Sequence, residues 1–372
     1  MATNHQGTMD NYLLRRPKNV AAWALKAKQR PLTVSNAPYT APPKGHVAIQ
    51  VIDVAINPID WIMQESDLFG LQYPAIFGCD VAGEIIEVAD DVRDLHAGQR
   101  VIAHCNGYSA RDASHGAFQK CAIVPKNAVA ELPYGIATSI GVVLPLGIST
   151  AAAGLYQKTF LELPFPSEQP EALGRTVLIW GGSSSVGSCA IQLAVASGAE
   201  VITTASSRNF DYCRKLGAAQ CFDYHDKNVE DSIIAALKGK TVAGAYHAVG
   251  SEDATRACAR ILDQSQGKAI VVTVRGVPKG LPSSVRAKSI SSSTIFSNEV
   301  GPYIWRTFLP RALQTGTIVP APDPKIVGEE LRSVQLGLDK QKAGVSAAKI
   351  VVSNISQAGY RHRPLQTTPA WH

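Results

Sequence analysis

The stretch TVLIWGGSSSVGSCAIQ, residues Thr176–Gln192, decides the fold, because a buried strand runs through a turn of small residues into a helix. Gly182, Ser184 and Gly187 occupy the three positions of the pattern G-x-G-x-x-G, with serine in the middle. A pyrophosphate at a helix N-terminus needs exposed backbone amides and no bulky side chain in the turn, and the helix dipole attracts its charge. The stretch therefore predicts a dinucleotide site whose contacts are Gly182, Ser183, Ser184, Ser185, Val186 and Gly187.

Strand and helix patterns alternate downstream of this stretch. After the helix pattern at 186–197, strand patterns recur in EVITTAS, CFDY, GAYHAVG and KAIVVTV, with helix patterns at 209–216 and 229–237 among them. Alternation of this kind implies a parallel sheet whose crossovers are helical. The sequence thus predicts a doubly wound domain of the α/β class.

The segment before the stretch is rich in strand patterns. Residues 47–55 alternate apolar and polar side chains, and 83–88 and 99–103 are short strand patterns separated by turns. These features predict a β-rich, barrel-like module over 19–124. The strand pattern at 348–352, near the end of the chain, is a candidate to return to this module.

Two segments predict how the modules are connected. Residues 137–155 are rich in Ala and Leu and carry no charge, which predicts a buried helix interrupted at Pro145 and Gly147. Three prolines fall within LPFPSEQPEA at 163–172, and proline fixes φ and lacks an amide donor. This second segment is predicted to be a surface loop.

Composition narrows the class of protein. The 372 residues are 45% hydrophobic and 18% charged, which is typical of a folded chain of about two domains. The 36 Lys and Arg against 30 Asp and Glu give a formal charge of +6 without a basic block, so nucleic acid is not predicted as a partner. No uninterrupted apolar run reaches the roughly 18 residues that span a bilayer, so no membrane is predicted either. Seven irregularly spaced cysteines predict reduced thiols in a soluble, cytoplasmic protein.

The end of the strand pattern EVITTA selects between the two dinucleotides. An acidic residue there binds the ribose 2′-hydroxyl of NAD, whereas basic or hydroxyl side chains accept the 2′-phosphate of NADP. The chain has Ser206, Ser207 and Arg208 at this point, and the nearest acid, Asp211, lies beyond them. The sequence therefore predicts NADPH as the cofactor, with these three residues at its 2′-phosphate.

Five short motifs lie along the chain: VAINPID at 54–60, GCDVAGEI at 78–85, GQRV at 98–101, GGSSSVG at 181–187 and SAAKIVV at 346–352. Together they resemble the medium-chain dehydrogenase/reductase family, in its zinc-independent branch of quinone oxidoreductases and enoyl reductases. ASSRNFDYCRKLGA, FDYHD and NEVGPYI look similar to fungal CipB-like proteins with a zinc-binding-dehydrogenase domain.

The resemblance implies a GroES-like catalytic domain around a central Rossmann domain. The implied boundaries are an N-terminal extension at 1–18, the catalytic domain at 19–148, the Rossmann domain at 149–300, a return to the catalytic domain at 301–353 and a tail at 354–372. A monomer or homodimer is implied as well. Family position adds further cofactor contacts at Tyr224, Val249, Gly250, Val272, Thr273 and Lys349.

Zinc is not predicted, despite the name of that domain. The structural zinc of zinc-dependent relatives needs four closely spaced cysteines, and the sequence has no such cluster. Catalytic zinc in those relatives uses a Cys and a His-Glu pair, where this chain has Asn57 and Cys79–Asp80. Cys79, with His104 and Cys105 as its nearest companions, is predicted to be a buried structural thiol.

The absence of a predicted Lewis acid bears on the reaction. Oxidation of an alcohol would then need a protein base, whereas conjugate reduction needs hydride delivery and donors for the developing enolate. The sequence therefore predicts NADPH-dependent reduction of an activated C=C bond, in an enone or enoyl thioester, or of a quinone. The resemblance places Asn57 and Asp60 near the nicotinamide and Thr150 on the helix that lines the cleft, as candidate catalytic residues. A turn-forming Asn, a capping Asp and a helix-interior Thr are the alternative roles.

Two alternatives to this reductase stay open, namely an alcohol or ketone dehydrogenase and a non-redox or accessory protein that retains the nucleotide-binding domain. Many relatives carry a lysine after NPxDW or NPxDA, and this chain has Ile62 there, which favours the second alternative. Loss of the cation, together with Trp61, Met63 and Phe69, is also compatible with an apolar pocket wall, although apolar side chains near a domain edge are more often ordinary core. The predicted partner is a small apolar or aromatic substrate.

Overall fold

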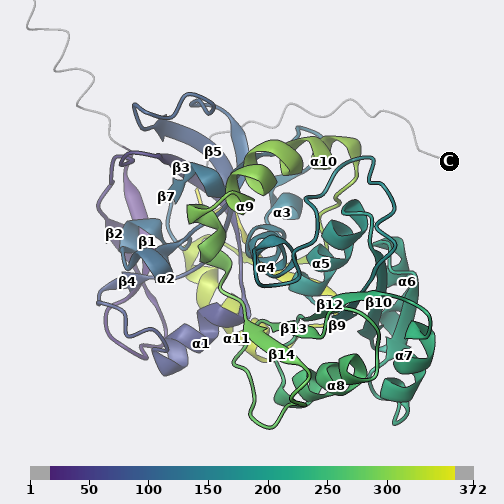
Figure 1. Cartoon of the computed structure of the whole chain (residues 1–372). Coiled ribbons are helices and arrows are strands. Elements are labelled where there is room, and N and C mark those ends of the chain that lie inside the picture. The colour runs from purple at the N-terminus through teal and green to yellow at the C-terminus, as the bar shows by residue number, and fades with distance from the viewer. Residues whose placement is uncertain (1–16, 357–372) are drawn as a thin grey trace, which may run out of the picture.

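The computed structural model describes residues 17–356. The predicted N-terminal extension up to residue 16 and the predicted tail from 357 onward lie outside the described residues. Within them the chain forms two lobes, a β-rich lobe in purple and blue and a lobe of alternating strands and helices in teal and green (Figure 1). Helix α4 (Pro145–Tyr156) lies between the two lobes.

The second lobe is built on the predicted parallel sheet. Its strand order in the described chain is β11-β10-β9-β12-β13-β14, and every pairing in it is parallel. The strands are β9 (Thr176–Trp180), β10 (Glu200–Ala205), β11 (Gln220–Asp223), β12 (Val242–His247), β13 (Ile270–Thr273) and β14 (Arg286–Ser289).

Both faces of this sheet are covered, as the apolar runs in its strands require. Because side chains alternate along a strand, Val177 and Ile179 of β9 pack with helices α4 and α5 on one face. Leu178 and Trp180 pack on the opposite face with α7 and α8. The doubly wound α/β fold predicted from the sequence is confirmed.

The β-rich lobe has two sheets in the described chain. The larger runs in the order β15-β16-β3-β5-β6-β8, with β7 also paired to β3, and the smaller is β2-β1-β4. The predicted strands at 47–55 and 348–352 correspond to β3 and β16. The bounds are β1 (Asn19–Ala24), β2 (Thr33–Ala37), β3 (His46–Ala55), β4 (Ala75–Ile76), β5 (Asp80–Val88), β6 (Arg100–His104), β7 (Cys121–Pro125), β8 (Val129–Glu131), β15 (Asp323–Glu329) and β16 (Ala348–Ser353).

The helices lie around and between these sheets. Helix α7 has the bounds predicted from the sequence, whereas α8 was not predicted. The bounds are α1 (Pro58–Ser66), α2 (Gly107–Ala110), α3 (Thr138–Gly141), α4 (Pro145–Tyr156), α5 (Ser185–Ala196), α6 (Phe210–Lys215), α7 (Val229–Leu237), α8 (Glu252–Asp263), α9 (Val300–Pro302), α10 (Leu309–Thr315) and α11 (Val334–Lys342), with a π-helical segment, Tyr303–Phe308, between α9 and α10.

The end of the chain returns to the first lobe. Strand β16 pairs antiparallel with β3, with Val351 opposite Ala55 and Val352 opposite Val54. One apolar cluster also crosses from α4 and α5 to strands of the β-rich lobe. The two lobes are therefore joined by a shared sheet strand and by a shared core.

Helix α4 departs in one respect from the sequence prediction. Gly147 lies inside the helix, and only Pro145 marks a boundary, at the first turn where a missing N–H costs nothing. A Cβ on Gly147 would lie 2.9 Å from Cys189 Sγ of α5, so the glycine allows close helix packing instead of breaking the helix. The helical stretch Thr138–Tyr156 is long and apolar enough to span a membrane, but 78% of its most apolar 18-residue window is buried inside the protein.

Candidate active site

The glycine-rich turn forms the cradle that a pyrophosphate requires. Ser184 is the N-cap of α5: its Oγ accepts from the Gly187 N–H at 3.0 Å and donates to the Gly181 carbonyl at 2.8 Å. Serine at the middle motif position therefore closes the first turn of the helix. A Cβ on Gly187 would lie 2.1 Å from the Gly181 oxygen, so only glycine fits.

The predicted 2′-phosphate residues gather at the ends of two neighbouring strands. Ser206, Ser207 and Arg208 follow β10, and the Tyr224 hydroxyl lies 3.1 Å from Ser206 Oγ. The Ser207 N–H donates to Asp223 Oδ2 at 3.2 Å, which orders the turn. Arg208 is exposed, and its guanidinium has no hydrogen-bond or ion-pair partner among residues 17–356.

The residues predicted to contact the nicotinamide divide between the surface of a cavity and the protein interior. Val249 is 56% exposed and lines the cavity described below, and Gly250 lies next to it at a shallower hollow. Val272 and Thr273 are buried inside β13, and Thr273 Oγ1 lies 3.2 Å from His247 Nδ1. These two residues do not line the cavity, which the chain reaches only after the strand ends, at 274–276.

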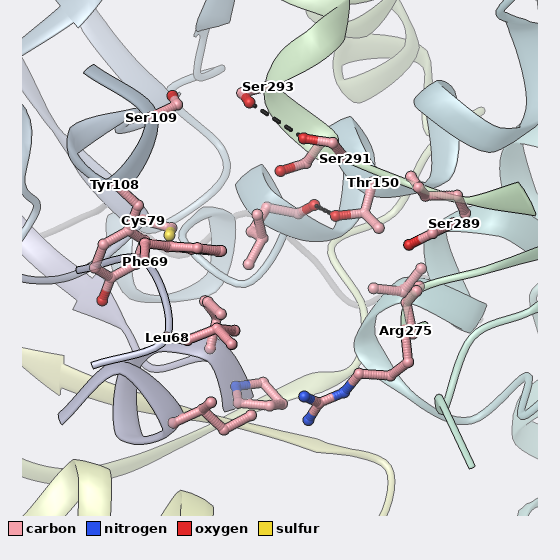
Figure 2. Close-up of a pocket in the computed structure, with 18 of the residues that line it drawn as sticks. Leu68, Phe69, Cys79, Tyr108, Ser109, Thr150, Arg275, Ser289, Ser291 and Ser293 are labelled. Atoms are coloured by element: carbon pink, nitrogen blue, oxygen red, sulfur yellow. Dashed lines mark hydrogen bonds between the residues drawn. The ribbon is translucent and has the colours of Figure 1, made fainter. Parts of the chain in front are cut away.

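A cavity of about 980 Å³ opens between the two lobes beside this end of the sheet. Leu68, Phe69 and Tyr108 lie on one side, and Arg275 and Ser289 lie on the other (Figure 2). The described residues that line the cavity include no Asp or Glu. The lining side chains from α1 and the segment after it, up to Phe69, are apolar, Arg111 and Arg275 bring two guanidinium groups, and no lining side chain among the described residues is anionic.

Two of the four predicted pocket residues line this cavity. Ile62 and Phe69 do so, and Ile59, one turn before Ile62 on α1, lies on the same face. Met63 is fully buried in the core, and Trp61 faces α11, where Lys342 Nζ lies 6.0 Å from its ring centroid. Trp61 and Met63 therefore do not line this cavity, because the helical period turns them away from it.

A buried polar cluster lies under the cavity. Lys349 Nζ is 2.9 Å from Asp80 Oδ2, donates to Asn57 Oδ1 and lies 3.4 Å from Ser185 Oγ in the glycine-rich turn. Asp80 also accepts from Asn57 Nδ2 at 2.9 Å and from the Leu146 N–H at 2.7 Å. Lys349, predicted as a cofactor contact, thus connects the catalytic lobe to the base of the pyrophosphate cradle.

Asp60 anchors a second group of contacts beside this cluster. Its carboxylate accepts from the Asn57 N–H at 2.7 Å and from the Tyr108 hydroxyl at 2.8 Å, and the Cys79 thiol lies 3.9 Å away. Burial raises the pKa of Asp60 to about 7 and that of the Cys79 thiol well above its usual value. The carboxyl group of Asp60 therefore titrates near neutral pH.

The three predicted catalytic residues differ in whether they reach the surface of the cavity. Asn57 and Asp60 are buried and do not line the cavity, and their polar atoms are hydrogen-bonded to neighbouring protein groups. Thr150 does line the cavity, but its hydroxyl donates to the Leu146 carbonyl at 2.6 Å. The structure therefore places one of the three at the cavity surface.

The raised pKa of Asp60 predicts a pH-dependent stability. The unfolded chain releases this proton near pH 4 and the folded chain near pH 7, so the free energy of unfolding falls as pH rises between these values, by about 1.4 kcal/mol per pH unit. The variant Asp60→Asn is expected to lack this slope. Urea unfolding of both proteins at pH 5.5, 6.5 and 7.5 measures it, and parallel curves for the two would contradict the assignment.

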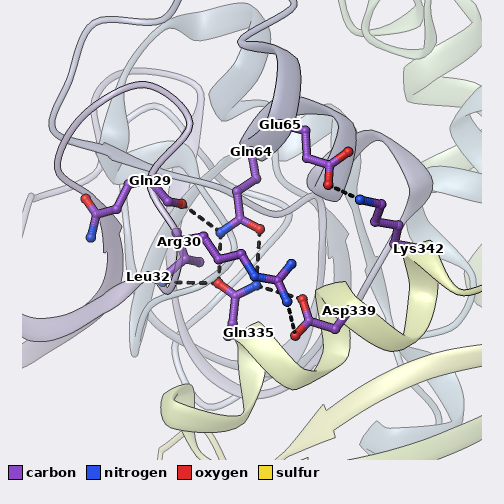
Figure 3. A network of polar contacts seen from close by, with 8 residues as sticks. All are labelled: Gln29, Arg30, Leu32, Gln64, Glu65, Gln335, Asp339 and Lys342. Atoms are coloured by element: carbon purple, nitrogen blue, oxygen red, sulfur yellow. Dashed lines mark hydrogen bonds and ion pairs between the residues drawn. The ribbon is translucent and has the colours of Figure 1, made fainter.

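A polar network fixes the helix that carries Ile59 and Ile62 (Figure 3). Gln64 Nε2 of α1 donates to Gln335 Oε1 of α11 at 2.8 Å and to the Gln29 carbonyl at 2.9 Å. Arg30 pairs with Asp339 at 2.8 Å in the same group. Helix α11, in the C-terminal part of the chain, thus fixes α1 through hydrogen bonds on the side away from the cavity.

Comparisons with known proteins agree with this architecture. Residues 43–134 match the model of the alcohol dehydrogenase GroES-like domain, and 185–313 match that of the zinc-binding dehydrogenase. The trans-enoyl reductase himH of Aspergillus japonicus is 42% identical over 90% of this chain and 97% of its own, and the zinc-binding alcohol dehydrogenase domain-containing protein cipB of Emericella nidulans is 40% identical over 90% and 98%. A solved alcohol dehydrogenase superfamily protein of Novosphingobium aromaticivorans, 24% identical, superposes with a TM-score of 0.74 over 90% of this chain and 99% of its own.

A GroES-like lobe joined to a doubly wound lobe with a dinucleotide cradle defines a class of two-domain, nicotinamide-dependent oxidoreductases. The chain belongs to the medium-chain dehydrogenase/reductase family. The family resemblance read from the motifs is confirmed, including its likeness to CipB-like proteins.

The side chains of this site do not fit a zinc ion, although one matching family model is named zinc-binding dehydrogenase. Zinc is bound by thiolate, imidazole and carboxylate groups, whereas Asn57 supplies an amide and Asp80 is paired with the ammonium of Lys349. The Cys79 thiol faces Asp60 instead of this cluster. No group of three or more His, Cys, Asp or Glu side chains within 17–356 is arranged to hold a metal ion.

Proposed function

We propose that the protein is an NADPH-dependent reductase of activated C=C bonds, in enones or enoyl thioesters, or of quinones. NADPH supplies the hydride when it is bound in the cradle. The observation that carries the proposal is the cavity, which lies beside the cradle, has apolar side chains from α1 and the segment after it, and has no carboxylate among the described residues that line it. The 42% identity to a protein named trans-enoyl reductase supports the same chemistry.

The cavity favours conjugate reduction over alcohol oxidation. Alcohol oxidation without a metal needs a base that takes the hydroxyl proton, and no lining Asp or Glu within the described chain is available for it. Reduction of an activated alkene needs only a hydride path and a donor for the carbonyl oxygen. The apolar side chains from α1 and the segment after it suit the predicted small apolar or aromatic substrate.

The proposal is tested by titration and turnover in one assay. Nicotinamide fluorescence follows the binding of NADPH and NADH, after which an enone, an enoyl-CoA thioester, a naphthoquinone and a saturated ketone are added in turn. Oxidation of NADPH by the enone or thioester, with a saturated carbonyl product, is expected. Turnover of the saturated ketone alone would favour the alcohol or ketone dehydrogenase, and binding without any turnover would favour a non-redox role.

The choice of NADPH over NADH is proposed from the turn after β10. Arg208→Ala is expected to weaken NADPH binding by about 10- to 100-fold, because a charge-assisted hydrogen bond is worth about 1.5–3 kcal/mol. NADH binding is expected to stay unchanged. Arg214→Ala is the matched control, since Arg214 is also exposed nearby but pairs with Asp211. An unchanged NADPH affinity in Arg208→Ala would show that the 2′-phosphate is bound elsewhere.

The setting of the enzyme is also part of the proposal. We infer a cytoplasmic enzyme that acts as a monomer or homodimer on a small molecule, without nucleic acid or membrane partners. All seven cysteines are free, which suits a reducing compartment.

A further inference from the structure

His104 ends β6 at the floor of the cavity and was not among the predicted site residues. It lines the cavity with only 3% of its surface exposed, and its ring packs edge-on against Phe296 with centroids 5.1 Å apart. It follows that the ring is held in one orientation by its surroundings.

Neither ring nitrogen of His104 has a hydrogen-bond partner among residues 17–356. Nδ1 is completely covered by protein. Nε2 is not among the side-chain atoms that the protein covers completely. His104 lines the cavity, so the cavity is the space to which Nε2 is open. The Nε2 edge of the ring therefore faces the cavity.

The ring carries a single proton. Burial, aided by the positive charge of Lys349, lowers the pKa of His104 to about 3, so the imidazole is neutral at physiological pH. Buried N–H groups without an acceptor are rarer than under-satisfied acceptors. The proton thus belongs on Nε2, and the lone pair of Nδ1 lies in the protein interior.

Two other hydroxyls of the cavity are already committed to protein groups, whereas Ser289 and Arg275 carry uncommitted donors only on the exposed part of its wall. The Thr150 hydroxyl donates to the Leu146 carbonyl at 2.6 Å, and the Tyr108 hydroxyl donates to Asp60 at 2.8 Å. Of the two buried polar side chains that line the cavity in the described chain, Thr150 and His104, only His104 keeps a free donor.

We propose that His104 Nε2–H is the catalytic hydrogen-bond donor to the carbonyl oxygen of the substrate. This inference rests on the proposed reduction of an activated alkene. The β-carbon would accept the hydride with the electron pair of a C–H bond of NADPH, which is oxidised to NADP⁺, and the π-electrons of the C=C bond would move to give an enolate oxygen. The α-carbon would then take a proton from water, which leaves hydroxide. The neutral ring donates a hydrogen bond throughout and keeps its own proton, as a preorganised donor does.

The test compares two substitutions, His104→Phe, which keeps a flat ring without a donor, and His104→Gln, which restores an N–H. With a medium-chain enone and saturating NADPH, kcat/KM of His104→Phe is expected to fall by about 100-fold or more. His104→Gln is expected to recover at least about tenfold of that loss. The NADPH dissociation constant and the Tm are expected to match the wild type in both variants.

The outcomes separate this inference from the proposed function. No turnover of any alkene by the wild type would overturn the proposed function and the inference with it. An active wild type with His104→Phe within threefold of it would overturn the inference alone. A parallel loss of NADPH affinity or Tm would assign His104 a structural role and overturn the inference as well.

Discussion

Replacing Lys349 with methionine is expected to lower the free energy of unfolding by about 3–5 kcal/mol, because the substitution leaves Asp80 charged and without its cation in the interior. The Asp80 side chain is 0% exposed and that of Lys349 is 3% exposed. The Lys349 ammonium also donates to Asn57 and approaches Ser185, so its loss uncouples three elements at once. Urea unfolding at constant pH measures the change.

An exposed lysine in a comparable ion pair provides the control. Lys342 pairs with Glu65, but these side chains are 46% and 41% exposed. Exposed ion pairs contribute about 0–1 kcal/mol, so Lys342→Met is expected to change stability by less than that amount. If Lys349→Met and Lys342→Met lowered the free energy of unfolding equally, burial would not determine how much the Asp80–Lys349 pair contributes to stability.

The dinucleotide cradle could be predicted from the sequence because its requirements are local. A buried strand, a turn of small residues and a helix occupy one continuous stretch, and each imposes a recognisable pattern. Ser184 illustrates this: it departs from glycine at the middle position, yet a serine N-cap is itself a local signal.

The walls of the cavity could not be predicted in the same way. Ile62 and His104 lie about forty residues apart in the sequence, and they line one cavity with Ser289 of the other lobe only in the folded chain. Trp61 and Met63 have the same apolar character as Ile62, and only the rotation of α1 separates them. His104 becomes distinctive through its missing partners, which no sequence pattern records.

Two elements of the doubly wound lobe, α8 and β14, were not predicted from the sequence, for different reasons. Helix α8 carried a readable signal, with Ser251 as N-cap and buried side chains at Ala254, Cys258 and Ile261, so it could have been predicted. Strand β14 has the polar sequence RAKS, and its strand conformation depends on pairing with β13. Tertiary pairing of this kind leaves no periodicity in the sequence.

Substituting Gly187 with alanine is expected to weaken the binding of both NADPH and NADH on the order of 100-fold. The new Cβ would lie 2.1 Å from the Gly181 oxygen and 2.8 Å from the Gly182 Cα, and both are backbone atoms of the cradle. The turn must therefore move, and its amides no longer point at the pyrophosphate. Losing two charge-assisted hydrogen bonds at the low end of their range, about 1.5 kcal/mol each, accounts for the size of the effect.

Two further variants show whether this loss comes from the position of the backbone. Gly135→Ala adds the same methyl group where no atom lies within 4 Å, and it is expected to bind both cofactors normally. Ser184→Ala removes the helix cap without a clash, at a cost of about 1 kcal/mol in stability, which separates folding from binding. Since Arg208→Ala is expected to affect NADPH alone, a Gly187→Ala variant that still bound NADH normally would show that the pyrophosphate does not lie on this turn.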